Sequence, residues 1–259
     1  MQLFDSHCHL NDKAFEKDVM DVIKRAHAAG VTHMMVAGID RKTSLFGVKL
    51  AEAVKGIYAS VGVHPHDASE CSDAVINFLT DVAASEKVKA WGEIGLDFNR
   101  MYSPRLVQEK WMEKQLEAAD KLDLPVIFHE RDSKGRFLEM LKASGKPVRD
   151  GVVHCFSGST KELYAYLDMG LYIGITGIIT MTERGKSLNE QITHIPTERL
   201  LIETDAPYLT PKPENKSFKR NEPAFVKSVM MRIAEALKKD FEPLAAEVFE
   251  NTRRVFRIP

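Results

Sequence analysis

Two histidines separated by one residue stand near the start of the chain. His7 and His9 flank Cys8 at the end of a short apolar run. If this run is a β-strand, its side chains alternate between two faces, so both imidazoles point one way and Cys8 points the other. Two imidazoles on one face can bind a divalent metal. The pair is common by chance, however, so its meaning depends on the ligand-type residues that accompany it.

Four more residues with metal-ligating side chains occur where later apolar runs end, namely Glu93, His129, His154 and Asp205. In a parallel barrel the carboxyl ends of all strands meet at one mouth, so residues far apart in sequence become neighbours there. Imidazole nitrogen and carboxylate oxygen suit Zn, Mn, Fe, Ni or Mg, and the lack of thiolates argues against a closed structural zinc site. We therefore predict that divalent metal is bound by His7, His9, Glu93, His129, His154 and Asp205.

Two further histidines, His64 and His66, follow the third apolar run. Unperturbed imidazole titrates near neutrality, so either ring could donate a proton or contact a substrate. We expect a substrate role for His64, whereas His66 is predicted to shape its loop.

The elements that must position these residues alternate regularly along the chain. Short β-branched or apolar runs are each followed by a longer amphipathic stretch, which is typical of βαβ units. The predicted strands lie near 3–6, 31–37, 57–63, 88–94, 125–129, 151–155, 171–175 and 199–204. Eight repeats predict an α/β fold in which residues 1–259 form one domain, a (β/α)8 TIM-type barrel with the metal site at the C-terminal face of its strands. An open doubly wound sheet is the alternative.

Helix boundaries follow from capping residues. Gly30 is expected to end the first helix. Later helices are predicted to begin near Lys42, Ser72, Pro104, Ser133, Ser159 and Gly185, with Pro104 in a first turn and the three serines as N-caps.

Composition limits the classes of protein that the chain can be. Its 259 residues are 44% hydrophobic, enough for a sizeable core, and its formal charge of -1 provides no overall attraction to nucleic acid or anionic membrane. No signal peptide or membrane span is evident. The three cysteines are an odd number in a chain that needs no disulfides, which predicts a cytoplasmic protein.

Seven segments of the chain, taken in order, resemble the TatD family of metal-dependent deoxyribonucleases within the amidohydrolase-like barrels. They are 4–10, 62–66, 92–97, 125–129, 153–158, 203–209 and 221–223, which are spread along nearly the whole chain. The resemblance implies a barrel with two divalent ions, in which His7, His9, Glu93 and Asp205 surround one ion and Glu93, His129 and His154 the other. Glu130 departs from the pattern, because relatives tend to have a smaller or uncharged residue there.

The loop 210–222, after the last strand, carries several basic residues. Lys216, Lys219 and Arg220 are predicted to bind substrate phosphates together with His64, with support from Lys212, Arg100 and Arg105. A solvated charged loop is the alternative, since Glu214 and Glu222 dilute the patch. A local patch without overall basic charge predicts modest, salt-sensitive binding to short or single-stranded ends.

The predicted reaction is hydrolysis of a phosphodiester bond by a metal-activated water. Two cations (Mg, Mn or Zn) would lower the pKa of that water and neutralise phosphoryl charge. Glu93 and Asp205 are the expected catalytic residues, Asp205 as proton acceptor, since no nucleophilic Ser or Cys motif is evident. The resemblance also implies a 3′-5′ exodeoxyribonuclease, with DNA or another phosphodiester as partner and no membrane or obligate protein partner. A small-molecule amidohydrolase and a binding or scaffolding barrel are the alternatives.

Overall fold

Eight parallel strands form the centre of the molecule and pair in chain order. The computed structural model describes residues 2–144 and 150–259. The strands are β1 (Leu3–Cys8), β2 (Val31–Val36), β3 (Ile57–Val61), β4 (Val88–Asp97), β5 (Val126–Arg131), β6 (Gly151–Val153), β7 (Tyr172–Ile175) and β8 (Leu200–Ile202). Each strand pairs in parallel with the next, and the order β1 to β8 excludes the doubly wound alternative.

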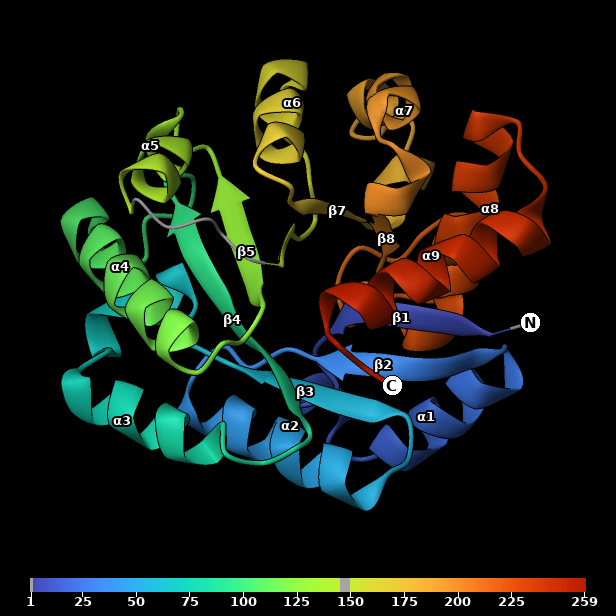
Figure 1. The fold of residues 1–259 in the computed structure, drawn as a ribbon. Helices are drawn as coiled ribbons and strands as arrows, with labels where there is room; N and C mark the ends of the chain where they lie inside the picture. The colour runs from blue at the N-terminus through green and yellow to red at the C-terminus, as the bar shows by residue number, and fades with distance from the viewer. Residues whose placement is uncertain (1, 145–149) are drawn as a thin grey trace.

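Helices surround this sheet in a ring (Figure 1). They are α1 (Val19–Ala28), α2 (Arg41–Ala53), α3 (Asp73–Val82), α4 (Arg105–Lys121), α5 (Arg136–Ala143), α6 (Thr160–Asp168), α7 (Lys186–Gln191), α8 (Val226–Leu237) and α9 (Phe241–Val255). The predicted (β/α)8 barrel is therefore confirmed.

The barrel closes where the chain leaves β8 and meets β1. The main-chain N–H of Asp205 donates to the carbonyl of His7 at 3.0 Å. The buried Asp5 carboxylate accepts from the main-chain N–H of Thr204 at 2.8 Å and from its hydroxyl at 2.5 Å. Side-chain hydrogen bonds therefore take part in closing the barrel, and they fix the end of β8 beside the end of β1.

The amino-terminal end of the barrel is filled by apolar side chains. Those from the strands are Phe4, Met35, Ala90, Ile127, Val152, Tyr172 and Leu201, and they pack against Phe249, Val255, Phe256 and Ile258 from α9 and the residues after it. A second buried layer separates the strands from the outer helices. One end is packed with apolar groups, and the buried polar side chains of the candidate site converge at the opposite, carboxyl-terminal mouth.

Strand β4 is irregular where it approaches β5. Its register against β5 shifts between Trp91 and Ile94, and Gly92 and Gly95 have φ angles of 149° and 147°. A Cβ on Gly95 would lie 1.9 Å from the carbonyl oxygen of His129. Glycine is therefore required here, because the backbones of β4 and β5 approach closely where both strands deliver side chains to the mouth.

Several strand ends differ from the predicted ones. β4 and β5 continue to Asp97 and Arg131, beyond the predicted ends at 94 and 129. β6 ends at Val153 instead of 155, because Cys155 adopts a left-handed φ of 49°.

Two helix starts also need correction. Pro104 is the N-cap of α4 and precedes its first turn. Ser133 is not an N-cap, since α5 begins at Arg136 after Gly135. By contrast, Ser72 and Ser159 cap α3 and α6 as predicted.

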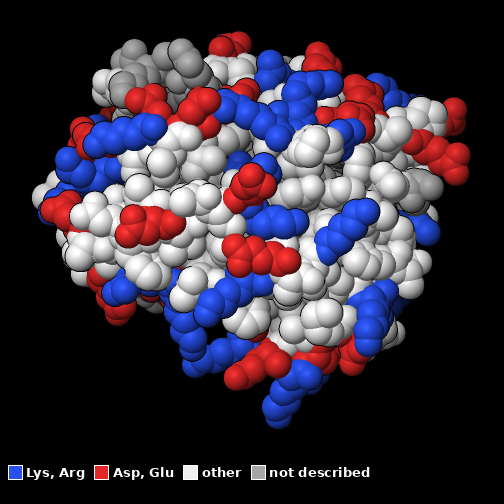
Figure 2. Space-filling model, turned by 60° about the horizontal axis from the view of Figure 1, so that its bottom comes forward, with Lys and Arg blue, Asp and Glu red and all other residues white. Residues whose placement is uncertain are grey.

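Acidic and basic side chains are interspersed over the face that Figure 2 presents. This agrees with the balanced charge of the chain. None of the helices in residues 2–144 and 150–259 has the length and apolar character needed to span a bilayer.

Candidate metal centre

Glu93 lies at the middle of the mouth, with imidazoles on both sides of its carboxylate. Its side chain is almost fully buried, and it projects inward from β4 together with Asp97, two pleats further on. The intervening Ile94 and Leu96 point outward and belong to the layer under the helices. The alternation that places apolar groups outside therefore aims both carboxylates at the mouth.

One oxygen of Glu93 faces the ligands from β1 and β8. Glu93 Oε2 lies 3.2 Å from His7 Nε2 and 3.9 Å from His9 Nε2. Asp205 Oδ1 lies 3.2 Å from His9 Nε2 and 3.9 Å from His7 Nε2. The two imidazole nitrogens are themselves 3.2 Å apart.

The other oxygen of Glu93 faces ligands from β5 and the end of β6. Glu93 Oε1 lies 2.7 Å from His129 Nδ1 and 3.1 Å from His154 Nε2. His64 Nε2, which follows β3, lies 3.3 Å from the same oxygen. All six predicted metal ligands thus meet at one place, and His64 joins them.

These separations suit donors that share a cation. Ligands about 2.1 Å from a metal are roughly 3.0–3.4 Å from one another in octahedral or tetrahedral arrangement. Within the described part of the chain, three groups have ligand atoms that all lie within 4.8 Å of one another: His7, His9 and Glu93; His7, His154 and Asp205; and His64, Glu93 and His129. Imidazole nitrogens and carboxylate oxygens are donors that divalent ions accept. These residues therefore fit divalent metal ions.

Two buried carboxylates determine which ring nitrogen His129 and His154 each direct toward Glu93. Asp97 Oδ2 lies 3.2 Å from His129 Nε2, which directs Nδ1 toward Glu93. Glu203 Oε1 lies 3.2 Å from His154 Nδ1, which directs Nε2 toward Glu93. A carboxylate behind a histidine fixes its tautomer and ring orientation. Sequence reasoning did not assign Asp97 or Glu203, although their even spacing, four residues after Glu93 and two residues before Asp205, was a usable signal.

In His64 the ring nitrogen that faces the mouth carries a proton, so this tautomer does not suit metal ligation. Its Nδ1 accepts the main-chain N–H of His66 at 3.0 Å, so the proton of the neutral ring is on Nε2. Burial lowers the pKa of His64 to about 4, more than the nearby Glu93 carboxylate can offset, so the ring is neutral near pH 7. Nε2 therefore acts as a hydrogen-bond donor toward the mouth.

The charges at the centre are set by opposed effects. Burial alone would raise the pKa of Glu93, but the surrounding imidazoles, above all His154, hold it well below its usual range. Burial likewise opposes ionisation of Asp205, and its hydrogen bond with His9 lowers its pKa. Burial would lower the pKa of His154, whereas Glu93 and Glu203 raise it well above the ordinary value. The centre thus holds ionised carboxylates among imidazoles, and a divalent ion would replace the proton that the raised pKa favours on His154, because a histidine binds metal only as the neutral ring.

The predicted phosphate-binding residues of the loop 210–222 differ in their surroundings. Arg220 donates to both carboxylate oxygens of Asp18, at 2.8 and 2.7 Å, and to Glu222 at 2.8 Å, and its guanidinium covers the ring of Phe15. These contacts fix the end of the loop to the start of α1. Lys216 and Lys219 are exposed on the same loop.

Glu130 points away from the mouth, as strand alternation allows. Its carboxylate accepts hydrogen bonds from the main-chain N–H and the hydroxyl of Ser133, at 3.0 and 2.6 Å. Cys8 also points away, toward the carbonyl of Met35.

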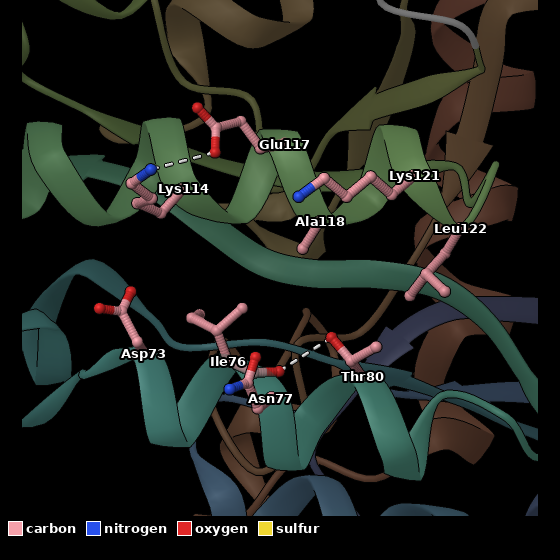
Figure 3. Close-up of a pocket in the computed structure, with 9 residues that line it drawn as sticks. All are labelled: Asp73, Ile76, Asn77, Thr80, Lys114, Glu117, Ala118, Lys121 and Leu122. Atoms are coloured by element: carbon pink, nitrogen blue, oxygen red, sulfur yellow. Dashed lines mark hydrogen bonds and ion pairs between the residues drawn. The ribbon is translucent and has the colours of Figure 1, made fainter.

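A groove of about 340 Å³ lies elsewhere, on the outer surface between α3 and α4 (Figure 3). Its apolar lining residues are Ile76, Ala118 and Leu122, and Lys114 pairs with Glu117 on α4 at 3.2 Å. None of the six predicted ligands borders it, so it is separate from the metal centre.

Comparison with known proteins identifies the family of the chain. A family model described as TatD related DNase matches residues 4–257. The chain belongs to the TatD family. A TatD relative from Salmonella typhimurium, named 3′-5′ ssDNA/RNA exonuclease TatD, is 41% identical over 99% of both chains. A Bacillus subtilis protein named uncharacterized metal-dependent hydrolase YabD is 38% identical, again over 99% of both.

Solved structures extend the likeness to the TatD fold. YJJV, a TatD homologue from Escherichia coli, superposes with a TM-score of 0.91 at 31% identity, covering 99% of this chain and 98% of that one. A TatD-family hydrolase from Entamoeba histolytica gives 0.88 at 25% identity, covering 98% of both chains. The match along the whole chain includes every strand that contributes to the centre.

Proposed function

We propose that this protein is a divalent-metal-dependent 3′-5′ exonuclease that hydrolyses single-stranded DNA ends. The observation that supports this most directly is the carboxylate of Glu93, whose two oxygens face two separate sets of ligands. A carboxylate placed in this way can bridge two cations, with His7, His9 and Asp205 on one side and His129 and His154 on the other. The names of the TatD relatives support the nuclease activity and its direction.

When bound, two divalent ions supply a hydroxide near neutral pH and neutralise charge on the phosphoryl oxygens. Asp205 is suited to take the proton of the attacking water. Its side chain is 15% exposed, against 3% for Glu93, and its contacts with the two histidines are made through Oδ1. Oδ2 is therefore the atom proposed to receive the proton.

His64 is proposed to bind the scissile phosphate. Its Nε2–H points into the mouth, and its neutral ring donates a hydrogen bond without adding charge. A donor aimed at a phosphoryl oxygen stabilises the charge that grows there in the transition state. This role agrees with the tautomer better than direct metal ligation does.

Lys216 and Lys219 are proposed to hold more distant phosphates of the strand. Both lie exposed on the loop that follows β8, whereas the guanidinium of Arg220 is already engaged by Asp18 and Glu222. Arg220 is thus better suited to fixing the loop than to binding DNA. The two lysines are therefore the residues proposed to contact the phosphates.

The test is a hydrolysis assay on metal-stripped protein resupplied with Mg, Mn or Zn. Single-stranded DNA labelled at its 5′ end should shorten progressively from the 3′ end, and a 3′-phosphorothioate cap should block the reaction. RNA, duplex DNA and a simple phosphodiester complete the panel. Undiminished cleavage after chelation would exclude the metal-dependent mechanism, and hydrolysis of the simple diester alone would exclude the exonuclease.

A further inference from the structure

Tyr208 presents a half-exposed aromatic ring at the β8 side of the metal centre. The ring is 53% exposed and lies edge-on to His9, with centroids 6.1 Å apart. Its hydroxyl donates to Asp12 at 3.1 Å, and its main-chain carbonyl accepts from the Asn221 side chain at 2.6 Å. The side chain is therefore held in place while one side of its ring remains open to solvent.

Tyr102 presents a second exposed ring at the opposite side. It is 64% exposed and lies edge-on to His66, with centroids 4.8 Å apart. Its hydroxyl accepts a long hydrogen bond of 3.4 Å from Arg100. The next residue, Ser103, is buried and donates to the carbonyl of His66 at 2.8 Å, which fixes the loop that carries the ring.

The two rings flank the centre along a continuous series of contacts. Tyr208 adjoins His9, which faces Oε2 of Glu93. Oε1 of Glu93 faces His129, and His129 shares the Asp97 carboxylate with His66, at 3.2 and 2.7 Å. His66 in turn adjoins Tyr102. The scissile phosphate would lie between the two tyrosines.

Exposed aromatic rings of this kind have a specific use next to a phosphodiester site. Covering a large apolar ring that is exposed to water lowers the free energy of the complex, and every nucleobase has a flat face that can cover such a ring. Because the hydroxyl of Tyr208 already bonds Asp12, little further rotamer entropy is lost when a base stacks on that ring. Stacking is also tolerant of sequence, which suits an enzyme that removes successive nucleotides.

We propose that Tyr208 and Tyr102 are stacking platforms for the two nucleobases on either side of the scissile phosphate. This inference rests on the proposed nuclease function, and adds that the bases, as well as the phosphates, are bound. Flat bases in an unpaired strand can turn toward the rings, whereas bases in a duplex remain stacked on one another. The platforms therefore also account for a preference for single strands.

The direct test uses fluorescence of 2-aminopurine, which is quenched by stacking on an aromatic ring. Oligonucleotides carry the probe at the 3′-terminal or the penultimate position and are bound by metal-stripped protein in chelator. Quenching at one position should be lost in Tyr208→Ala and at the other in Tyr102→Ala. The Phe variants keep the ring and should keep the quenching. Tyr208→Leu replaces Tyr208→Ala if the smaller side chain disturbs folding.

Hydrolysis provides the second readout. Each alanine variant should lose roughly 5- to 150-fold in kcat/KM on normal single-stranded DNA, the range expected for one base–aromatic stack. The loss should nearly vanish on DNA whose two 3′-terminal nucleotides are abasic tetrahydrofuran analogues. Tyr164→Ala is the matched control, because Tyr164 is 46% exposed but bonds His194 at 3.0 Å on the outer helices.

The outcomes separate this inference from the function on which it rests. Quenching without any cleavage of nucleic acid by the wild-type protein would overturn the nuclease proposal and leave base stacking supported. Cleavage with equal quenching in the wild type and both alanine variants would overturn the stacking platforms alone. Equal losses on normal and abasic DNA would also overturn them, since the rings would then act without a base.

Discussion

At the scale of single residues, the centre depends on how one carboxylate divides its two oxygens. Oε2 of Glu93 lies close to the imidazole of His7 on β1. Oε1 lies close to the imidazoles of His129 on β5 and His154 after β6. Neutral nitrogens alone could hold a cation on each side, but only an anionic bridge offsets the repulsion between two cations placed close together.

Replacing Glu93 by Gln keeps the size of the side chain and removes the charge. We expect the second ion to be lost or weakly held, and activity to fall by at least about 10², since transition-state stabilisation at the metals is lost. His129→Ala should remove mainly one ion, because His7, His9 and Asp205 still hold the other. Metal content and turnover measured on both variants test this, and two tightly held ions with near-normal turnover in Glu93→Gln would contradict the bridge.

Asp97 and Glu203 act through the histidines that they orient. Asp97→Asn and Glu203→Gln preserve shape but weaken the hold on the tautomers of His129 and His154, so affinity for metal should fall by about 10- to 100-fold. Metal titration followed by Co(II) absorption measures this without any substrate. Glu130→Gln is the control, because its carboxylate contacts Ser133. Unchanged metal affinity in both centre variants would show that the rings are held by packing alone.

At the scale of elements, β4 places two carboxylates at the mouth because its outward positions are apolar. In β4, Ile94 and Leu96 pack under the helices, and the alternation leaves Glu93 and Asp97 at the mouth. The loop after β8 works differently: Asn221 and Arg220 fix its end to β8 and α1, whereas the middle of the loop remains exposed.

The loop lysines should therefore affect binding of long substrates only. Lys216→Ala combined with Lys219→Ala should weaken DNA binding and reduce its salt dependence by up to about two phosphate contacts, each of which releases counterions. Hydrolysis of a simple phosphodiester should be unaffected. Binding isotherms at several salt concentrations measure the effect, with Lys121→Ala on α4 as a surface control. Equal losses on both substrates would mean that the loop supports the metals or the fold.

At the scale of the whole molecule, the two ends of the barrel differ in what fills them. The amino-terminal end is packed by α9 and the residues after it, and the carboxyl-terminal end carries the candidate metal centre. Stability and chemistry are thereby concentrated at opposite ends of the same strands, as is usual for this fold.

Truncating Phe256 to Ala should accordingly reduce stability and leave the centre intact. The ring is 1% exposed within the apolar end, so its loss should cost about 3–5 kcal/mol. For a chain of this size the midpoint of thermal unfolding should fall by roughly 6–20 °C. Scanning calorimetry measures the shift, and metal content well below the midpoint should match the wild type. Loss of metal without loss of stability would show that the two ends are coupled.

The sequence by itself determined the barrel, the six proposed ligands and the family, because ligand-type side chains at the ends of apolar runs can be recognised one strand at a time. Only the tertiary structure decided which ring nitrogen each histidine presents. That choice depends on Asp97 for His129 and on Glu203 for His154, carboxylates from strands distant in sequence. It also decided that Arg220 is engaged by Asp18, a contact between residues 202 positions apart. Periodicity reports which face a side chain occupies, whereas its hydrogen-bond partner is set by the strands and loops that folding brings beside it.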